Sequence, residues 1–160
     1  GSAGTVLLGK SLGERRMDKA KEDASSLCRC TFAVSVLTAI VIILFRKPVI
    51  SIFDLTPLAQ DYLNFMLLVS SYYVIGQAMN TLNIAGIFRA GGNSRFGLIC
   101  DTIVMWVIAV PLGFISAFGL HLRPKVVYFI LCLDEFWKIP VVYRYYKSGK
   151  WLNNITREYE

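Results

Sequence analysis

Three long stretches without a charged residue constrain the fold of this chain more than any other feature of its sequence. They run from Tyr62 to Phe88, from Thr102 to Leu120 and from Thr31 to Phe45. A helix needs roughly 20 apolar residues to cross a bilayer, and core helices of soluble proteins rarely run so far without a charge. The sequence therefore predicts three membrane helices, over residues 27–45, 58–88 and 98–120.

A fourth, mostly apolar stretch at residues 126–146 differs because it carries charges near its middle. Asp134, Glu135 and Lys138 lie there, and each ionisable group at the centre of a membrane helix costs about 2.5–3.5 kcal/mol on insertion scales. The lysine follows the aspartate by four residues and the glutamate by three, so it can pair with both. We predict a fourth membrane helix that turns this polar face toward other helices.

The composition favours a membrane protein and excludes a disordered chain. Hydrophobic residues make up 55% of the 160 residues and charged residues 18%, whereas soluble domains have about 45–50% and about 25%. The net charge is +6, but the basic residues do not gather on one polar stripe, so we expect no nucleic acid as a partner. The predicted fold class is all-α, a polytopic bundle of about four membrane helices preceded by the end of another helix at residues 1–9.

The positions of lysine and arginine predict how this bundle is oriented. Twelve of the 17 lie in three segments that four spans would place on one side (residues 10–29, 89–101 and 144–160), and four lie in the connections on the other side. Loops on the cytoplasmic side carry the excess of positive charge. Residues 10–30 are therefore predicted to form a cytoplasmic loop and residues 147–160 a cytoplasmic tail, in a multi-pass protein of the plasma membrane.

Polar side chains follow one face of the predicted helix at 58–88. At helical spacing they fall within an arc of about 100°; they are Ser70, Tyr73, Gln77, Asn80 and Thr81. Lipid cannot satisfy such groups, so they must face protein or a water-filled cavity. Hydrogen bonding between helices and lining of a substrate cavity both remain open, and the second interpretation assigns the cavity to Tyr73, Gln77, Asn80 and Thr81.

Two carboxylates, Asp101 and Glu135, are candidates for cation or proton coupling, because a carboxylate within a membrane can carry a proton or coordinate Na⁺. The structural alternatives are an interfacial or capping role for Asp101 and a salt bridge for Glu135. The four cysteines and His121 lack the spacing of a zinc site. We expect no catalytic residue, metal or cofactor apart from a coupling Na⁺ or H⁺.

Residues Gly4 to Ser11 match the P-loop pattern G-x-x-x-x-G-K-S. A P-loop requires a preceding strand, however, and only three residues precede Gly4. The intervening residues are apolar, and we expect the match to be a coincidence. A membrane-embedded NTPase is kept as an alternative on this ground alone.

Four motifs, in order, resemble those of the multidrug and toxic compound extrusion (MATE) transporters. They are Gly9-Lys10-Ser11-Leu12-Gly13-Glu14, Ile52-Phe53-Asp54 leading to Ala59-Gln60-Asp61-Tyr62-Leu63, Gly86-Ile87-Phe88-Arg89-Ala90-Gly91-Gly92-Asn93-Ser94-Arg95, and the basic run from Tyr145 to Trp151. The resemblance implies a fold of twelve helices in two lobes around a central cavity. This chain would be a fragment, the last third of that fold, and would contain the end of helix eight followed by helices nine to twelve.

The resemblance also implies a function. Such a transporter is a cation-coupled (Na⁺ or H⁺) antiporter that exports drugs or organic, mainly cationic, metabolites while its lobes rock against each other. The partners would be the lipid bilayer, the substrate and the missing N-terminal lobe. Some family members hold the cation with a carboxylate on the tenth helix; Gln77 or Ala78 occupies that position here, so that site is absent or altered.

Two further alternatives remain. A lipid-linked-precursor flippase of related fold would need a cavity rich in arginine and lysine, and the spans contain almost none. A soluble helical interaction module would have to bury the long apolar stretches.

Overall fold

The computed structural model describes residues 2–14 and 16–152, and within them every regular element is a helix. The all-α prediction is confirmed. The elements are α1 (Ser2–Gly13), α2 (Met17–Ile52), α3 (Pro57–Thr81), the π-helix η1 (Leu82–Phe88), α4 (Ser94–Ile103), the π-helix η2 (Val104–Ala109), α5 (Val110–Phe114), the π-helix η3 (Ile115–Gly119), α6 (Pro124–Leu131) and α7 (Asp134–Lys147).

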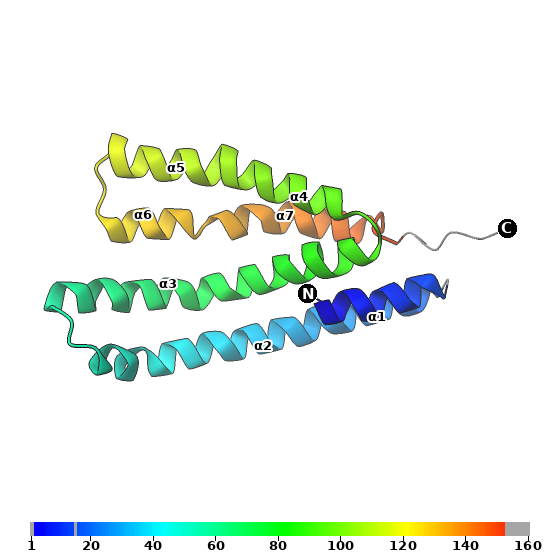
Figure 1. The fold of residues 1–160 in the computed structure, drawn as a ribbon, viewed down its shortest axis with the longest axis horizontal. Helices are drawn as coiled ribbons and strands as arrows, with labels where there is room; N and C mark the ends of the chain where they lie inside the picture. The colour runs from blue at the N-terminus through cyan, green and yellow to red at the C-terminus, as the bar shows by residue number, and fades with distance from the viewer. Residues whose placement is uncertain (1, 15, 153–160) are drawn as a thin grey trace.

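The helices form long rods that run back and forth (Figure 1). α3 continues into η1, and the helix from Ser94 to Gly119 is continuous through α4, η2, α5 and η3. The turns follow the sequence signals: the Thr56 side chain accepts a hydrogen bond from the backbone N–H of Ala59, and Pro57 opens α3. Proline fixes the backbone for a first helical turn, where its missing N–H has no cost. Pro124 opens α6 in the same way.

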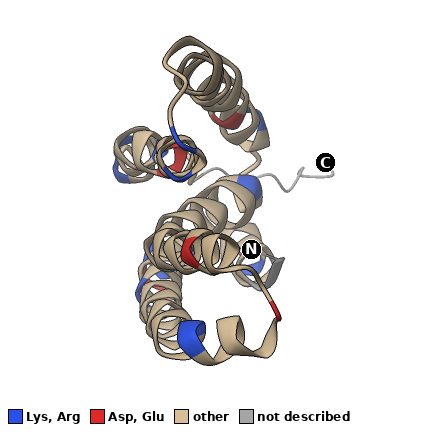
Figure 2. Cartoon of the chain, turned by 90° about the vertical axis from the view of Figure 1, so that its left-hand side faces the viewer, with Lys and Arg blue, Asp and Glu red and all other residues tan. Residues whose placement is uncertain are grey.

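Two of the helices, Met17–Ile52 and Ser94–Gly119, are long and apolar enough to cross a membrane. Their outer faces carry large apolar side chains that are more than 60% exposed, among them Val34, Leu37, Leu44, Trp106, Val107 and Phe118. A contiguous apolar surface of this extent is typical of contact with lipid. Figure 2 looks along the rods and shows how little of their ribbon is charged. That residues 58–88 and 126–146 also cross the membrane stays a prediction.

The predicted loop at residues 10–30 is instead largely helical. α1 extends to Gly13 and α2 begins at Met17, ten residues before the predicted start of that span. The two helices pack through fully buried Leu8, Leu12, Ala20 and Ala24. Charged residues suggested a loop, but lysine, glutamate and alanine are also good helix formers. At 1.5 Å per residue, the 36 residues of α2 span about 54 Å, more than the roughly 30 Å of a bilayer core.

The other predicted boundaries also shift. The helix predicted at 58–88 changes from α to π geometry at Leu82, and the one predicted at 98–120 begins at Ser94. Pro111 does not interrupt the latter; the π-helix η2 ends just before it, and local π geometry is one way in which a helix accommodates proline. The helix predicted at 126–146 is broken at Cys132 and Leu133, between α6 and α7.

A buried cluster gathers at the end of the bundle that holds the turn at 89–93. Leu8, Ile87, Phe88 and Trp151 are almost fully buried in it. The Asn93 side-chain amide donates to the Lys150 carbonyl at 2.8 Å, so the motif around Gly91 touches the motif that ends at Trp151. The turns at 53–56 and 120–123 lie at the opposite end (Figure 1). The position of the turns at opposite ends of the bundle agrees with the two-sided distribution of basic residues. Residues 153–160 of the predicted tail lie outside the described part of the chain.

Candidate functional site

Lys138 on α7 is the centre of a buried ion-pair cluster. Its Nζ lies 3.1 Å from Oε1 of Glu135, 3.4 Å from Oδ2 of Asp134 and 3.2 Å from Oδ1 of Asp101 on α4. The two predicted pairs within α7 are confirmed. The sequence did not predict Asp101 as a third partner, because it precedes Lys138 by 37 residues and only the packing of α4 and η2 against α7 brings it close.

Asn80 connects this cluster to α3. Its side-chain amide donates to Oε2 of Glu135 at 2.7 Å and to the Glu135 backbone carbonyl at 3.0 Å. Gly76, one turn earlier, makes the approach possible: a Cβ there would lie 3.3 Å from Cβ of Glu135, closer than most such contacts. The amide therefore compensates part of the cost of burying a carboxylate between two helices.

The cluster carries more negative than positive charge. Three carboxylates surround one ammonium, and Oδ1 of Asp134 is buried without a hydrogen-bond partner. The side chains of Glu135 and Lys138 are 8% and 10% exposed, whereas that of Asp101 is 48% exposed. The cluster is thus shielded at its centre and open at Asp101.

A cavity of about 540 Å³ adjoins this cluster. Gln77, Asn80 and Thr81 line it from α3, opposite Asp101 and Glu135. Tyr73 is not among its lining residues, and Ser70 pairs with the Tyr128 hydroxyl on α6 at 3.0 Å. The polar stripe is therefore divided: Ser70 joins helices, and the C-terminal part of the stripe faces a cavity. A role in substrate binding stays a prediction for Tyr73, Gln77, Asn80 and Thr81, and a role in coupling stays one for Asp101 and Glu135.

Other sequence signals do not form a site. The P-loop match at Gly4–Ser11 lies entirely within α1, and no strand occurs in the described residues, so the loop that would wrap a phosphate is absent and the NTPase alternative is not supported. In residues 2–14 and 16–152, no group of three or more His, Cys, Asp or Glu is arranged to hold a metal ion.

Comparison with known proteins identifies a transporter family. The family model MatE matches residues 1–115. The uncharacterized transporter YisQ of Bacillus subtilis (strain 168) is 25% identical over 154 residues, which cover 94% of this chain and 33% of YisQ. The multidrug resistance protein MdtK of Pectobacterium atrosepticum is 26% identical over 117 residues, or 73% of this chain and 25% of MdtK. Multidrug and toxin extrusion protein 1 of Pongo abelii is 25% identical over 122 residues, or 75% of this chain and 21% of that protein.

No solved structure matches the chain. The chain spans about a third or less of the length of these relatives. The matched residues include three of the four motifs that suggested the family, and they make up more than half of the sequence. Their helical fold and apolar outer surface agree with the match. The chain belongs to the MatE family, the multidrug and toxic compound extrusion transporters.

Proposed function

We propose that this chain is part of a cation-coupled antiporter that exports drugs or organic metabolites across the cell membrane. Relatives named for multidrug resistance and for multidrug and toxin extrusion support export of organic compounds. The chain would supply part of the C-terminal lobe, with its C-terminus in the cytoplasm, and the rest of the transporter would supply the other lobe. We expect no enzymatic activity and no cofactor.

The observation that carries this proposal is the excess negative charge on one side of the 540 Å³ cavity, whose remaining lining is mostly apolar. Three carboxylates and one lysine surround a space that amide and hydroxyl groups line from α3. Membrane proteins keep ionisable groups inside the bundle mainly where they move ions or protons or bind ligands. The excess favours a cationic substrate and disfavours a pyrophosphate-bearing lipid precursor, whose transport would need a cavity dominated by arginine and lysine.

The position of Lys138 favours H⁺ over Na⁺ as the coupling ion. Its ammonium already occupies the centre of the three carboxylates, where a bound metal cation would have to lie. Asp101 and Glu135 can still take up and release a proton. When one of them is protonated, Lys138 stays paired with the carboxylates that remain charged. Transport in proteoliposomes should therefore follow a pH gradient, and a Na⁺ gradient alone should drive little export.

Replacing Glu135 by glutamine is expected to lower export by about tenfold or more, since one charge-assisted hydrogen bond is worth about 1.5–3 kcal/mol. The amide keeps the size of the side chain but cannot take up a proton. Efflux of a cationic dye from cells that express the full-length transporter measures the effect, normalised to membrane expression. Asp61→Asn is the matched control, because Asp61 is an exposed carboxylate that pairs with Lys125 at the other end of the bundle. Equal losses in both variants would contradict the proposal.

Gln77 tests whether the cavity beside the ion-pair cluster contacts the substrate. It is exposed on α3 and lines the cavity, so Gln77→Leu should reduce dye efflux about two- to tenfold, the range that one lost hydrogen bond of about 0.5–1.5 kcal/mol gives. Expression should not change. Gln60→Leu, the same exchange in the first turns of α3 and away from this cavity, should leave efflux intact. Unchanged transport by Gln77→Leu would assign the stripe to helix packing.

A further inference from the structure

The end of the bundle that holds the turn at 89–93 carries an unbalanced group of basic residues. Residues 89–100 and 139–152 contain no acidic residue and five basic ones, which are Arg89, Arg95, Arg144, Lys147 and Lys150. All five are exposed. We call this set the basic patch. Within the described part of the chain, no carboxylate forms an ion pair with Arg89, Arg95, Arg144 or Lys147.

Tertiary contacts join the two segments of the basic patch into one surface. The Asn93 side-chain amide donates to the Lys150 carbonyl at 2.8 Å. The rings of Phe96 and Tyr145 stack with their centroids 3.7 Å apart, and each ring belongs to the direct neighbour of an arginine of the patch. Figure 1 shows the start of α4 beside the end of α7. Two short basic segments of the sequence therefore form a single cationic area.

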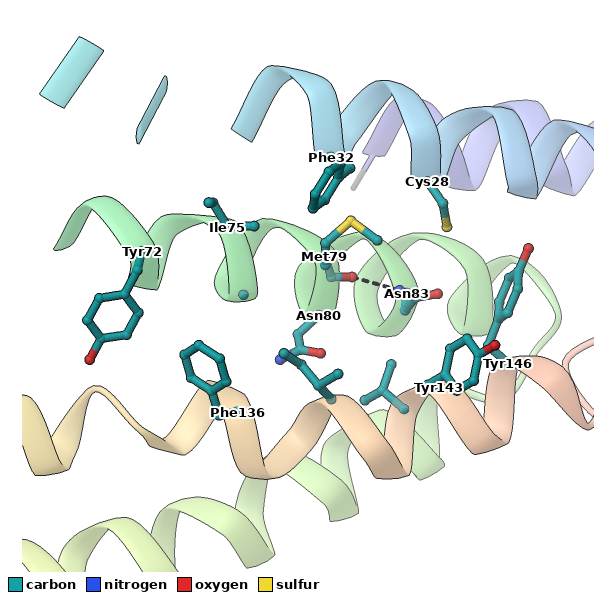
Figure 3. Close-up of a pocket in the computed structure, with 13 residues that line it drawn as sticks. Cys28, Phe32, Tyr72, Ile75, Met79, Asn80, Asn83, Phe136, Tyr143 and Tyr146 are labelled. Atoms are coloured by element: carbon teal, nitrogen blue, oxygen red, sulfur yellow. Dashed lines mark hydrogen bonds between the residues drawn. The ribbon is translucent and has the colours of Figure 1, made fainter. Parts of the chain in front are cut away.

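The apolar surface begins within one helical turn of the basic patch. Leu98 and Ile99 are 69% and 57% exposed, and they follow Arg95 by three and four residues, so they lie on its side of α4 and about 5 Å further along the helix. Tyr143 is 61% exposed, and Figure 3 shows it with Tyr146 on the last turns of α7. Tyrosine is enriched where the membrane meets water. The basic patch therefore lies at the depth of the lipid headgroups.

The segment that joins α1 and α2 at this end of the bundle has a different charge balance. Residues 10–24 contain five basic and four acidic residues. Arg16 lies 3.5 Å from the carboxylate of Glu14, and Ser11 donates a hydrogen bond to Asp23 at 2.8 Å. The attraction of an anion over several ångströms follows the summed charge, so this nearly balanced segment attracts anions much less than the basic patch does.

We propose that the basic patch binds the headgroup of an anionic phospholipid, with the acyl chains of that lipid along Leu98 and Ile99. Arginine can pair with a phosphate through two parallel N–H groups. A zwitterionic lipid brings its own ammonium group, which the patch repels. A soluble anion meets the same charges but has no chains for the adjoining apolar surface. The proposal concerns contact with the membrane and does not depend on the substrate or the coupling ion.

The test compares two lipids on the full-length transporter, by native mass spectrometry from detergent in ammonium acetate. Dioleoyl-phosphatidylglycerol is the anionic probe, and dioleoyl-phosphatidylcholine is the zwitterionic probe with the same chains. Arg144→Gln combined with Lys147→Gln removes two charges of the basic patch. Arg16→Gln combined with Lys19→Gln is the matched control, because it removes one arginine and one lysine from exposed positions at the same end of the bundle.

The unchanged protein is expected to bind the first phosphatidylglycerol about tenfold more tightly than phosphatidylcholine. Each lysine or arginine near an anionic surface contributes about fivefold, so the variant of the patch should lose most of this preference and the control should keep it. Raising the ammonium acetate concentration should reduce the preference, because salt screens exposed charges. Inorganic phosphate at the concentration of the lipid should not compete.

Several results would overturn the proposal. Equal affinity for the two lipids in the unchanged protein would mean that the patch attracts no headgroup or that another part of the transporter covers it. Equal losses in the two double variants would assign the preference to total charge, and a preference that survives in the patch variant would place it elsewhere. Competition by inorganic phosphate would assign the patch to a soluble anion. The comparison of lipids and its salt dependence use the unchanged protein, so they do not depend on whether a variant folds.

Discussion

Replacing Lys138 by methionine is expected to destabilise the folded protein by about 3–5 kcal/mol, the range measured when one partner of a buried ion pair is removed. The lysine is the common partner of three carboxylates, and Glu135 is 8% exposed. Methionine keeps much of the length of the side chain, so the loss comes mainly from charge. Unfolding by denaturant in detergent, or the yield of monodisperse protein, measures it.

Lys125→Met is the matched control for this change. Lys125 pairs with Asp61, whose side chain is 63% exposed, near the opposite end of the bundle. It also lies 5.3 Å from the centroid of the Tyr62 ring. Exposed pairs contribute about 0–1 kcal/mol and exposed cation–π contacts about 0.5–1 kcal/mol, so the control should lose far less stability. Adding Glu135→Gln to Lys138→Met should restore part of the loss, and failure of both expectations would contradict the electrostatic explanation.

Gly91→Ala is expected to disrupt the end of the bundle, at a cost of about 3 kcal/mol or more, the upper range for overpacking a filled site. A Cβ at Gly91 would lie 1.6 Å from the Trp151 carbonyl oxygen and 2.7 Å from its carbonyl carbon. These are backbone atoms, and they cannot turn aside as a flexible side chain can. Trp151 is 2% exposed, stacks on Tyr146 and donates from its Nε1 to the Tyr146 carbonyl, so its displacement would open the buried cluster.

Gly9→Ala provides the comparison, because a Cβ there meets no atom within 4 Å. Alanine is also the better helix former, so this change should leave stability unchanged or raise it by up to about 1 kcal/mol. Thermal unfolding followed by tryptophan fluorescence distinguishes the two variants. A similar loss in both would mean that glycine flexibility, and not the contact with Trp151, determines the stability of this region.

Asn80 lines two cavities, the one beside the ion-pair cluster and another of about 440 Å³ between α2, α3 and α7. Its amide also donates to Glu135. The contact between α3 and α7 therefore separates the two cavities, and Asn80 borders both of them.

Much of the fold was readable from local sequence. The stretch from Thr102 to Leu120 predicted a membrane helix, and the structure contains a span-capable helix from Ser94 to Gly119. Thr56 caps α3, and Pro57 and Pro124 each open a helix, which are the positions that these residue types favour. Residues 10–30 are largely helical although their charges predict a loop, because lysine, glutamate and alanine also have high helix propensity. The break at Cys132 was also missed, since neither it nor Leu133 is a residue that interrupts helices.

The sequence by itself determined the all-α class, the family and the pairing of Lys138 with Asp134 and Glu135, because hydropathy, short motifs and i,i+3 or i,i+4 spacing are properties of neighbouring residues. Only the tertiary structure decided that Asp101 and Asn80 join that cluster, that Gly91 meets Trp151 and that aromatic side chains of α2, α3 and α7 line one cavity. These contacts join residues far apart in the chain. They depend on how each helix is rotated about its axis and how closely it packs, and one sequence read locally does not contain that information.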